Sequence, residues 1–245
     1  MLDDRGKANI YLNLKSNFRE VLQSNNLLDQ HVVIHCKALS AKEAIGDPEH
    51  DDYPIIKGRE VIVEADFKGA KGQAFSDAFE QKTYKLMDLV DLELNTNKKR
   101  ASFIASLNAV YRYLGLCDKT VHCKDAEPVE CSDHLMNEIN FSKKVLLIGL
   151  QPRFLHVLSE KRCLRIVDLD QDNIGKVFNN IVVEPESNTA DALKWCDMVF
   201  ATGSTIINGT ISRFLEQPKP VVFYGITIAA AGKILGLRTY CRCGN

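Results

Sequence analysis

From residue 143 onward, short apolar runs of strand length alternate with segments of helical periodicity. This alternation constrains the fold strongly, because parallel strands in one sheet need crossover connections, which are usually helices. The predicted strands are residues 144–149, 163–168, 181–183, 198–201, 220–225 and 238–241, and the predicted helices are 154–161, 189–196, 206–215 and 229–235. The second half of this α/β chain is therefore predicted to be a Rossmann-like, mostly parallel, doubly wound sheet.

Polar and turn-forming residues gather where four of these predicted strands end. In doubly wound sheets, ligands bind beyond the carboxyl ends of the strands, where the strand order reverses. The four ends are residues 149–153, 168–173, 202–205 and 224–227. The candidate ligand-binding residues of this half are Gly149, Asp168, Thr202, Gly203, Ser204, Thr205, Asn208 and Thr227.

The stretch 197–210 changes from an apolar strand to helical spacing within Thr202-Gly-Ser-Thr205. Gly203 can take the tight turn, and Ser204 or Thr205 can cap the helix that follows. Such a junction directs free backbone N–H groups and the positive end of a helix toward a polar or anionic group above the strand. An ordinary capped strand–helix turn is the alternative interpretation.

The loop after the first of these strands argues against a dinucleotide cofactor. Asp168 follows Gly149 by about twenty residues, the spacing at which an acid contacts a ribose in dinucleotide-binding units. However, Gly149-Leu-Gln-Pro-Arg-Phe154 does not supply G-x-G-x-x-G, and Pro152 has no N–H to donate. S-adenosylmethionine has no pyrophosphate and stays an alternative.

The first half shows no regular alternation. Its pattern predicts a helix over residues 5–24, strands over 31–39 and 59–67, a loop over 45–54, and two helices within 84–116 that are split near 95–98. This order is typical of a small α+β domain. We predict an α+β domain over residues 1–140, with a polar linker at its end, and a Rossmann-like ligand-binding domain over 141–245.

Three residues of the first half are candidates for closing a cleft between these domains. Lys71 and Gln73 belong to residues 68–77, where two glycines and two lysines form either a hairpin turn or a wrap around an anion. Asn108 sits among apolar neighbours. A buried Asn needs hydrogen-bond partners, so it either ties down a backbone loop or faces a ligand.

The segment 120–134 is dense in groups that bind metals. His122, Cys123 and Cys131 lie there, and Cys241 and Cys243 could approach from the C-terminal end. Thiolates with imidazole suit a transition metal such as zinc, iron, nickel or copper. The spacing of Cys123 and Cys131 is not that of a C-x-x-C zinc site, so a polar linker with packed cysteines is the alternative. The remaining cysteines are Cys36, Cys117, Cys163 and Cys196, which we interpret as core residues.

The charge balance excludes some classes of partner. The chain has 31 Lys plus Arg against 32 Asp plus Glu, so it lacks the basic excess of nucleic-acid and anionic-membrane binders. No apolar run has transmembrane length, and residues 1–6 lack the hydrophobic region of a signal peptide. We therefore expect a cytoplasmic protein whose cysteines are thiols.

Four stretches resemble the putative heavy-metal chelation domain family. They are residues 64–77, 104–110, 202–210 and 224–227, of which Thr202-Gly-Ser-Thr-Ile-Ile-Asn-Gly-Thr210 is the most specific. The resemblance implies an enolase N-terminal-like domain followed by a Rossmann-like domain. It also implies a ligand site between the two, with a role in handling a metal or a metal-chelating small molecule.

Together these patterns predict a protein that binds a small polar or metal-chelating ligand in the cleft between its domains. A condensing or hydrolytic reaction linked to heavy-metal chelation is one expectation. A non-catalytic metal carrier or sensor that uses the cysteines is the first alternative. An S-adenosylmethionine-dependent methyltransferase-like enzyme is the second. The sequence leaves open whether the chain forms a homo-oligomer.

Overall fold

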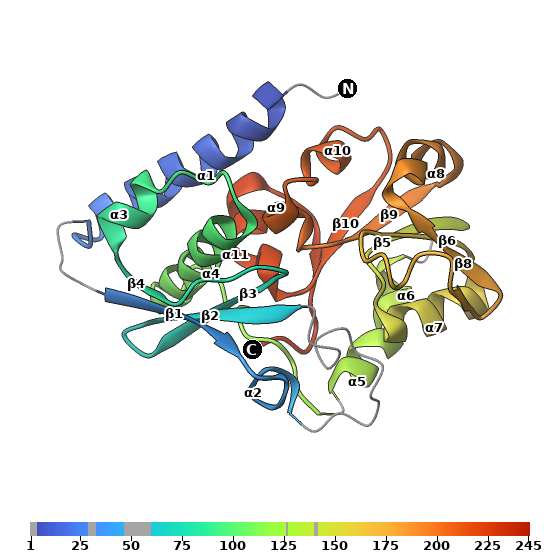
Figure 1. Ribbon diagram of the computed structural model, residues 1–245, viewed down its shortest axis with the longest axis horizontal. Coiled ribbons are helices and arrows are strands. Elements are labelled where there is room, and N and C mark those ends of the chain that lie inside the picture. The colour runs from blue at the N-terminus through green and yellow to red at the C-terminus, as the bar shows by residue number, and fades with distance from the viewer. Residues whose placement is uncertain (1–3, 29–32, 47–59, 126, 140–141) are drawn as a thin grey trace.

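The computed structural model describes residues 4–28, 33–46, 60–125, 127–139 and 142–245 (Figure 1). Its helices are α1 (Asp4–Ser24), α2 (Ala41–Ile45), α3 (Leu86–Asp91), α4 (Asn97–Tyr113), α5 (Glu127–Asp133), α6 (Leu135–Glu138), α7 (Pro152–Lys161), α8 (Thr189–Trp195), α9 (Thr205–Asn208), α10 (Ser212–Leu215) and α11 (Ala229–Leu235), with short 3₁₀ turns η2 (Glu186–Asn188) and η3 (Ile226–Ile228). Its strands are β1 (Val33–Leu39), β2 (Val61–Phe67), β3 (Ala70–Ser76), β4 (Lys82–Lys85), β5 (Lys144–Ile148), β6 (Cys163–Asp168), β7 (Val177–Phe178), β8 (Ile181–Pro185), β9 (Met198–Thr202), β10 (Val221–Tyr224) and β11 (Thr239–Tyr240). Most of the predicted loop 45–54 lies outside the described residues. Within these ranges, no helix combines the length and the apolar character that crossing a membrane requires.

The strands of the second half form one sheet in the order β11-β10-β9-β5-β6-β8-β7. Neighbouring strands are parallel except β7 and β8, which pair antiparallel. Starting from the central β5, the chain builds one side of the sheet and then returns to add β9, β10 and β11 on the other. The strand order therefore reverses between β5 and β9, and the predicted Rossmann-like sheet is confirmed.

The strands of the first half form a smaller antiparallel sheet in the order β3-β2-β1-β4. A tight turn at Lys68-Gly69 joins β2 to β3, and the Gly69 N–H donates to Asp66 Oδ1 at 2.9 Å. Residues 68–77 thus form the hairpin that was one of their two predicted structures. The second strand of this hairpin carries Lys71 and Gln73.

Helix α4 lies at the centre of the molecule, between the small sheet and the helices of the second half (Figure 1). All its residues from Ala101 to Tyr111 are buried, because one face packs on β2 and β3 and another packs against α9 and α11. One hydrophobic core therefore contains residues of both halves. The division at residue 140 stays a prediction, since the core continues across it.

The structure corrects two predicted helices. Residues 84 and 85, predicted as helical, end β4, because their backbone pairs with β1. The predicted helix 206–215 is interrupted between α9 and α10, where Gly209 adopts a φ of 79°. Left-handed backbone ends a helix, and glycine takes it without the steric cost that a side chain brings.

Candidate functional site

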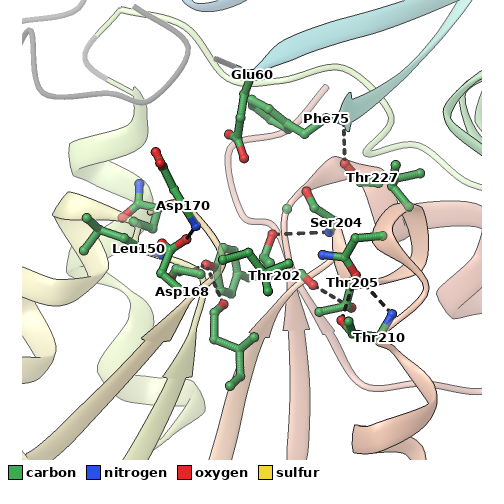
Figure 2. A pocket seen from close by; sticks show the side chains of 18 of the residues that line it. Glu60, Phe75, Leu150, Asp168, Asp170, Thr202, Ser204, Thr205, Thr210 and Thr227 are labelled. Atoms are coloured by element: carbon green, nitrogen blue, oxygen red, sulfur yellow. Dashed lines mark hydrogen bonds between the residues drawn. The ribbon is translucent and has the colours of Figure 1, made fainter. Parts of the chain in front are cut away.

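A cavity of about 480 Å³ lies at the carboxyl ends of the central strands, where the strand order reverses. Its floor comes from residues that follow β5, β6, β9 and β10. Residues of the first half line it as well, among them Glu60, Phe75 and Asp77. Figure 2 shows Glu60 and Phe75 facing the strand ends from the opposite side. The cavity is therefore shared by the two halves, where the sequence predicted a cleft.

Gly149 lies in close contact with residues of two other strand ends of this floor. It has a φ of 85°, and a Cβ at this position would lie 2.9 Å from Thr202 Cγ2 and 3.1 Å from the Tyr224 hydroxyl oxygen. The Tyr224 hydroxyl donates to the carbonyl oxygens of Ile148 at 3.1 Å and Gly149 at 2.9 Å. Burial raises the pKa of Tyr224, so this hydroxyl stays a donor. The ends of β5, β9 and β10 are thus held close together.

The carboxylate of Asp168 fastens two loops of the floor. Its Oδ2 accepts the Leu150 N–H at 2.6 Å, and its Oδ1 accepts the Asp170 N–H at 2.8 Å (Figure 2). The first bond holds the loop after β5, and the second holds the loop after β6. Any ligand group at Asp168 therefore shares the carboxylate with backbone donors.

The stretch 202–210 curls back on itself beside the cavity. The hydroxyl of Thr205 donates to the Thr202 carbonyl at 2.8 Å, and Asn208 Oδ1 accepts the N–H and the hydroxyl of Thr210 at 3.0 and 2.7 Å. Neither Ser204 nor Thr205 makes the predicted side-chain cap of α9, so that prediction was wrong. The reason is that α9 is a single helical turn. The side chains of Thr205 and Asn208 make hydrogen bonds with residues close to them in the sequence instead.

Thr202, Ser204, Thr205, Asn208 and Thr227 all line the cavity. Gly203 is buried and packs against η3, where a Cβ would lie 2.9 Å from the Ile228 nitrogen. Thr227 faces both halves of the molecule, because its Oγ1 accepts the Phe75 N–H at 3.0 Å (Figure 2).

Lys71, Gln73 and Asn108 lie outside the lining of the cavity. Gln73 is buried, donates to Glu64 Oε2 at 2.8 Å and accepts the His122 N–H at 2.7 Å. Lys71 pairs with Glu64 Oε1 at 3.1 Å. Glu64 therefore fixes Gln73, and Gln73 in turn fixes the backbone of the segment that carries His122.

Asn108 joins the two halves through backbone partners. Its Nδ2 donates to the carbonyls of Gln73 at 2.9 Å and Ile226 at 3.2 Å, and lies 3.4 Å from that of Thr227. Its Oδ1 accepts the Ala230 N–H at 2.9 Å. Of the two predicted roles, the structure shows a buried amide that ties down backbone.

The thiols gather at one end of the same cavity. His122, Cys123, Cys131 and Cys241 line it, and Cys243 lies against Cys131. Burial is the main reason why the pKa of Cys123 is raised, that of Cys241 is raised to about 12 and that of Cys243 to about 11. Burial lowers the pKa of His122 to about 4. As the side chains stand, no three His, Cys, Asp or Glu residues of the described ranges surround a point that could hold a metal ion.

The cavity is acidic. Its carboxylates belong to Glu60, Asp77, Asp168, Asp170 and Glu186. Among the described lysines and arginines, Arg213 alone lines the cavity, and it pairs with Glu186. A low-dielectric hollow with an excess of one sign of charge concentrates ligands of the opposite sign. This arrangement favours a cationic ligand, whereas the sequence pattern suggested a small polar or metal-chelating ligand whose polar or anionic end is held by Ser204, Thr205 and Asn208.

Sequence reasoning did not select Glu60, Arg213 or Glu186. Glu60 directly precedes β2, where a charged residue is ordinary, and its side chain reaches the cavity only through the packing of the two halves. Arg213 and Glu186 are far apart in the sequence and show no local pattern. Asp170 lies within the polar strand end 168–173, so a signal for it existed.

Glu60→Gln is expected to remove a pH dependence from the stability of the fold. Burial, and then Asp168, Asp170 and Asp77, raise the pKa of Glu60 from 4.5 to about 7. The folded protein thus holds this proton more tightly than the unfolded chain. The stability from Glu60 is fully present below the unfolded value of 4.5, and it is lost as the pH rises through about 7.

Urea unfolding at about pH 5 and about pH 8 measures this contribution. The free energy of unfolding should fall more steeply with pH in the wild type than in Glu60→Gln. Glu20→Gln removes an exposed carboxyl from α1 and should keep the wild-type slope. Identical slopes in the wild type and Glu60→Gln would show that the pKa of Glu60 is not raised in the folded protein.

Comparison with known protein families agrees with this architecture. Residues 133–237 match the model of a family described as putative heavy-metal chelation, DUF364. The resemblance predicted from the sequence is thereby confirmed over this region. Comparison with curated proteins finds no match.

Two solved structures are similar to the chain. One is a protein with unknown function from the DUF364 family of Pyrococcus horikoshii, with a TM-score of 0.52, 15% identity, and coverage of 89% of this chain and 79% of that chain. The other is a DUF364 family protein with unknown function from Desulfitobacterium hafniense, with a TM-score of 0.46, 16% identity, and coverage of 66% of each chain. At its low identity, the Pyrococcus likeness shows a shared fold.

Proposed function

We propose that this chain, whose residues 133–237 match the putative heavy-metal chelation family, binds a cationic metal chelate in its acidic cavity. The observation that supports this most directly is the charge of the lining. Five carboxyl groups and one guanidinium line the cavity, and the guanidinium is already paired with one of the carboxyl groups. Glu60 adds its negative charge as the pH rises through about 7. A chelate of a metal ion with a neutral or basic small molecule has the complementary charge.

The rest of the lining suits the organic part of such a ligand. Thr202, Ser204 and Thr210 bring hydroxyls to one wall, and the apolar side chains of Phe75 and Leu150 lie on others (Figure 2). A concave site with a few converging polar groups among apolar ones is the usual form of a small-molecule site. The hydroxyls would orient the chelator, and the carboxylates would balance its charge.

Hydrogen bonds also hold the loops and strand ends around the cavity in place. Asp168 fastens the loops after β5 and β6, and Thr227 bonds the end of β10 to β3 across the two halves. A preorganised site spends less binding free energy on ordering its own side chains and loops. The structure thus supports binding of one particular size and charge of ligand.

Calorimetry with two nickel complexes tests the proposal. Nickel(II) with triethylenetetramine is a dication, and nickel(II) with ethylenediaminetetraacetate is a dianion, so the two probes share the metal and differ in charge. The wild type should bind the cationic complex in preference to the anionic one. At about pH 8, where Glu60 is ionised, the double variant Glu60→Gln, Asp170→Asn should bind the cationic complex about tenfold more weakly or worse, because two nearby charges are removed.

Asp172→Asn is the matched control for this experiment. Asp172 is exposed in the loop of Asp170 but lies outside the lining of the cavity, so its loss should leave binding of the cationic complex unchanged. Preference for the anionic complex, or binding that the double variant does not weaken, would overturn the proposal.

S-adenosylmethionine is a second candidate ligand. It also carries a positive charge, and Gly149 follows β5 while Asp168 ends β6, the parallel strand beside it. The same calorimetric titration with S-adenosylmethionine distinguishes the two. Uptake of S-adenosylmethionine by a protein that ignores both nickel complexes would replace the metal chelate as the ligand.

A further inference from the structure

Four cysteines from three segments of the chain come together here: Cys123, Cys131 and Cys241 line the cavity, and Cys243 packs against the cluster that contains Cys131. Cys123 follows the loop that runs beside β3, Cys131 belongs to α5, and Cys241 and Cys243 follow β11. The first two are 7% and 6% exposed. All four lie outside residues 133–237, so the family match does not account for them.

Backbone hydrogen bonds hold these segments together. The N–H groups of Thr120 and Val121 donate to the Asn245 carbonyl at 2.9 and 2.6 Å, and the Asn245 N–H donates to the Val121 carbonyl at 3.0 Å. The hydroxyl of Tyr240 donates to the Cys131 carbonyl. The meeting of the thiols is therefore fixed by the fold and does not depend on contact between the thiols themselves.

The imidazole of His122, which also lines the cavity, has a ring nitrogen without a hydrogen-bond partner among the described residues. The Nδ1 atom of His122 is buried and makes no hydrogen bond within the described part of the chain. Its ring lies edge-on to Phe75, with centroids 5.2 Å apart, and its backbone N–H is held by Gln73. Burying a polar atom without a partner is costly, so such an atom in the same lining as Cys123, Cys131 and Cys241 indicates a site that takes a ligand.

The arrangement does not fit a structural zinc site. A structural zinc ion needs four ligands in a tetrahedron, and no three suitable side chains of the described ranges surround one point. The four cysteines are free thiols. Closed-shell soft cations such as copper(I) and silver(I) need fewer ligands, because two thiolates in a line complete their coordination.

We propose that Cys131 and Cys243, with Cys123 and Cys241 beside them, bind a soft monovalent cation such as copper(I) at the thiol end of the cavity. Cys131 belongs to the buried cluster against which Cys243 packs, so these two thiols lie close to each other. On binding, each of two S–H groups releases its proton to solvent and forms an S–metal bond. No electron is transferred, so the step needs no oxidant or reductant.

This inference rests on the proposed function, since both place a metal in one cavity. The inference adds two points to the proposed function. The ion belongs to the class of soft cations, and the sulfur ligands select that class. The carboxylates and hydroxyls of the lining are hard oxygen ligands, which a soft cation does not prefer. The sulfur ligands and the oxygen ligands can therefore be tested with different variants and probes.

Competition for copper(I) tests the thiol site. The reduced protein, kept free of oxygen, is titrated with copper(I) in the presence of the chromogenic chelator bicinchoninate. The wild type should withdraw one copper(I) ion from the chelator. The double variant Cys131→Ser, Cys243→Ser should bind it at least about tenfold more weakly, since even the loss of a group that only supports a metal ligand costs that much.

Cys117→Ser, Cys163→Ser is the matched control, because neither cysteine lines this cavity and the number of thiols removed is the same. It should retain copper(I) like the wild type. X-ray absorption at the copper edge of the loaded wild type gives a readout that does not depend on a variant's folding. Two sulfur neighbours are expected, and nitrogen or oxygen ligands in their place would overturn the inference.

The nickel titration separates this inference from the proposed function. If the cysteine double variant retains copper(I) like the wild type but the cationic nickel complex still binds, the thiol site is wrong and the proposed function stands. If copper(I) binding depends on the cysteine pair but the nickel complex does not bind, the thiol site stands and the proposed function falls.

Discussion

Gly72→Ala is expected to destabilise the fold by about 3 kcal/mol or more, out of the 5–15 kcal/mol typical of natural domains. A Cβ on Gly72 would lie 2.1 Å from the Ala109 nitrogen, 2.3 Å from the Ala105 carbonyl oxygen and 2.7 Å from the Asn108 carbonyl carbon. These are backbone atoms of α4, a helix buried along most of its length, so no side chain can rotate away to make room. The methyl group must therefore push β3 and α4 apart.

Urea unfolding of Gly72→Ala and Gly175→Ala measures this clash. Gly175 has a φ of 81° and nothing within 4 Å of its added Cβ, so alanine there meets only the strain of left-handed backbone, about 1–2 kcal/mol. The difference between the two variants isolates the collision with α4. Equal losses of stability would show that β3 and α4 lie farther apart than described.

The same substitution should also disturb the thiol end of the cavity. Gln73 follows Gly72 in β3 and holds the His122 N–H, so a shift of β3 moves the segment that carries His122 and Cys123. A Gly72→Ala protein that still folds at low temperature should bind copper(I) more weakly than the wild type. The packing of a glycine against a helix thus affects a site to which the glycine makes no contact.

The large sheet could be predicted from the sequence because its strands are buried on both faces. Val145, Leu146 and Leu147 of β5 are fully buried, and such strands appear in a sequence as uninterrupted apolar runs. Strand β4 could not be predicted in the same way. Its four residues have one buried side chain, that of Tyr84, and β4 is a strand only because β1 lies beside it.

The sequence predicted those residues of the candidate site that lie at the ends of strands. It could not predict the roles of residues that depend on their hydrogen-bond partners. Gly149, Asp168 and Thr202 lie at one cavity because the carboxyl ends of parallel strands meet at one edge of a sheet. Gln73 and Asn108 look the same in a sequence whether their amides face a ligand or the backbone. Their actual partners are 35 or more residues away, apart from Glu64, so no local pattern could reveal them.

Asn108→Ala is expected to destabilise the fold by about 3 kcal/mol or more, because it leaves several buried backbone groups without partners. The Ala230 N–H lies in the first turn of α11, where no intrahelical acceptor exists, and Asn108 Oδ1 is its acceptor. The carbonyls of Gln73 and Ile226 lose their donor at the same time. Asn25→Ala is the control, since Asn25 is exposed and makes one such bond, to the Val21 carbonyl.

Asn108→Asp tests the same amide by its charge. An aspartate keeps an acceptor for the Ala230 N–H, but it faces the Gln73 and Ile226 carbonyls with an oxygen in place of the donor. Burial and these carbonyls should raise the pKa of the new carboxyl above that in the unfolded chain, so the variant loses stability as the pH rises through that interval. Unfolding at acid and neutral pH should therefore show Asn108→Asp close to the wild type in acid and far below it at neutrality. A deficit that does not change with pH would mean that the side chain reaches water, and the two halves of the molecule would then not be joined at Asn108.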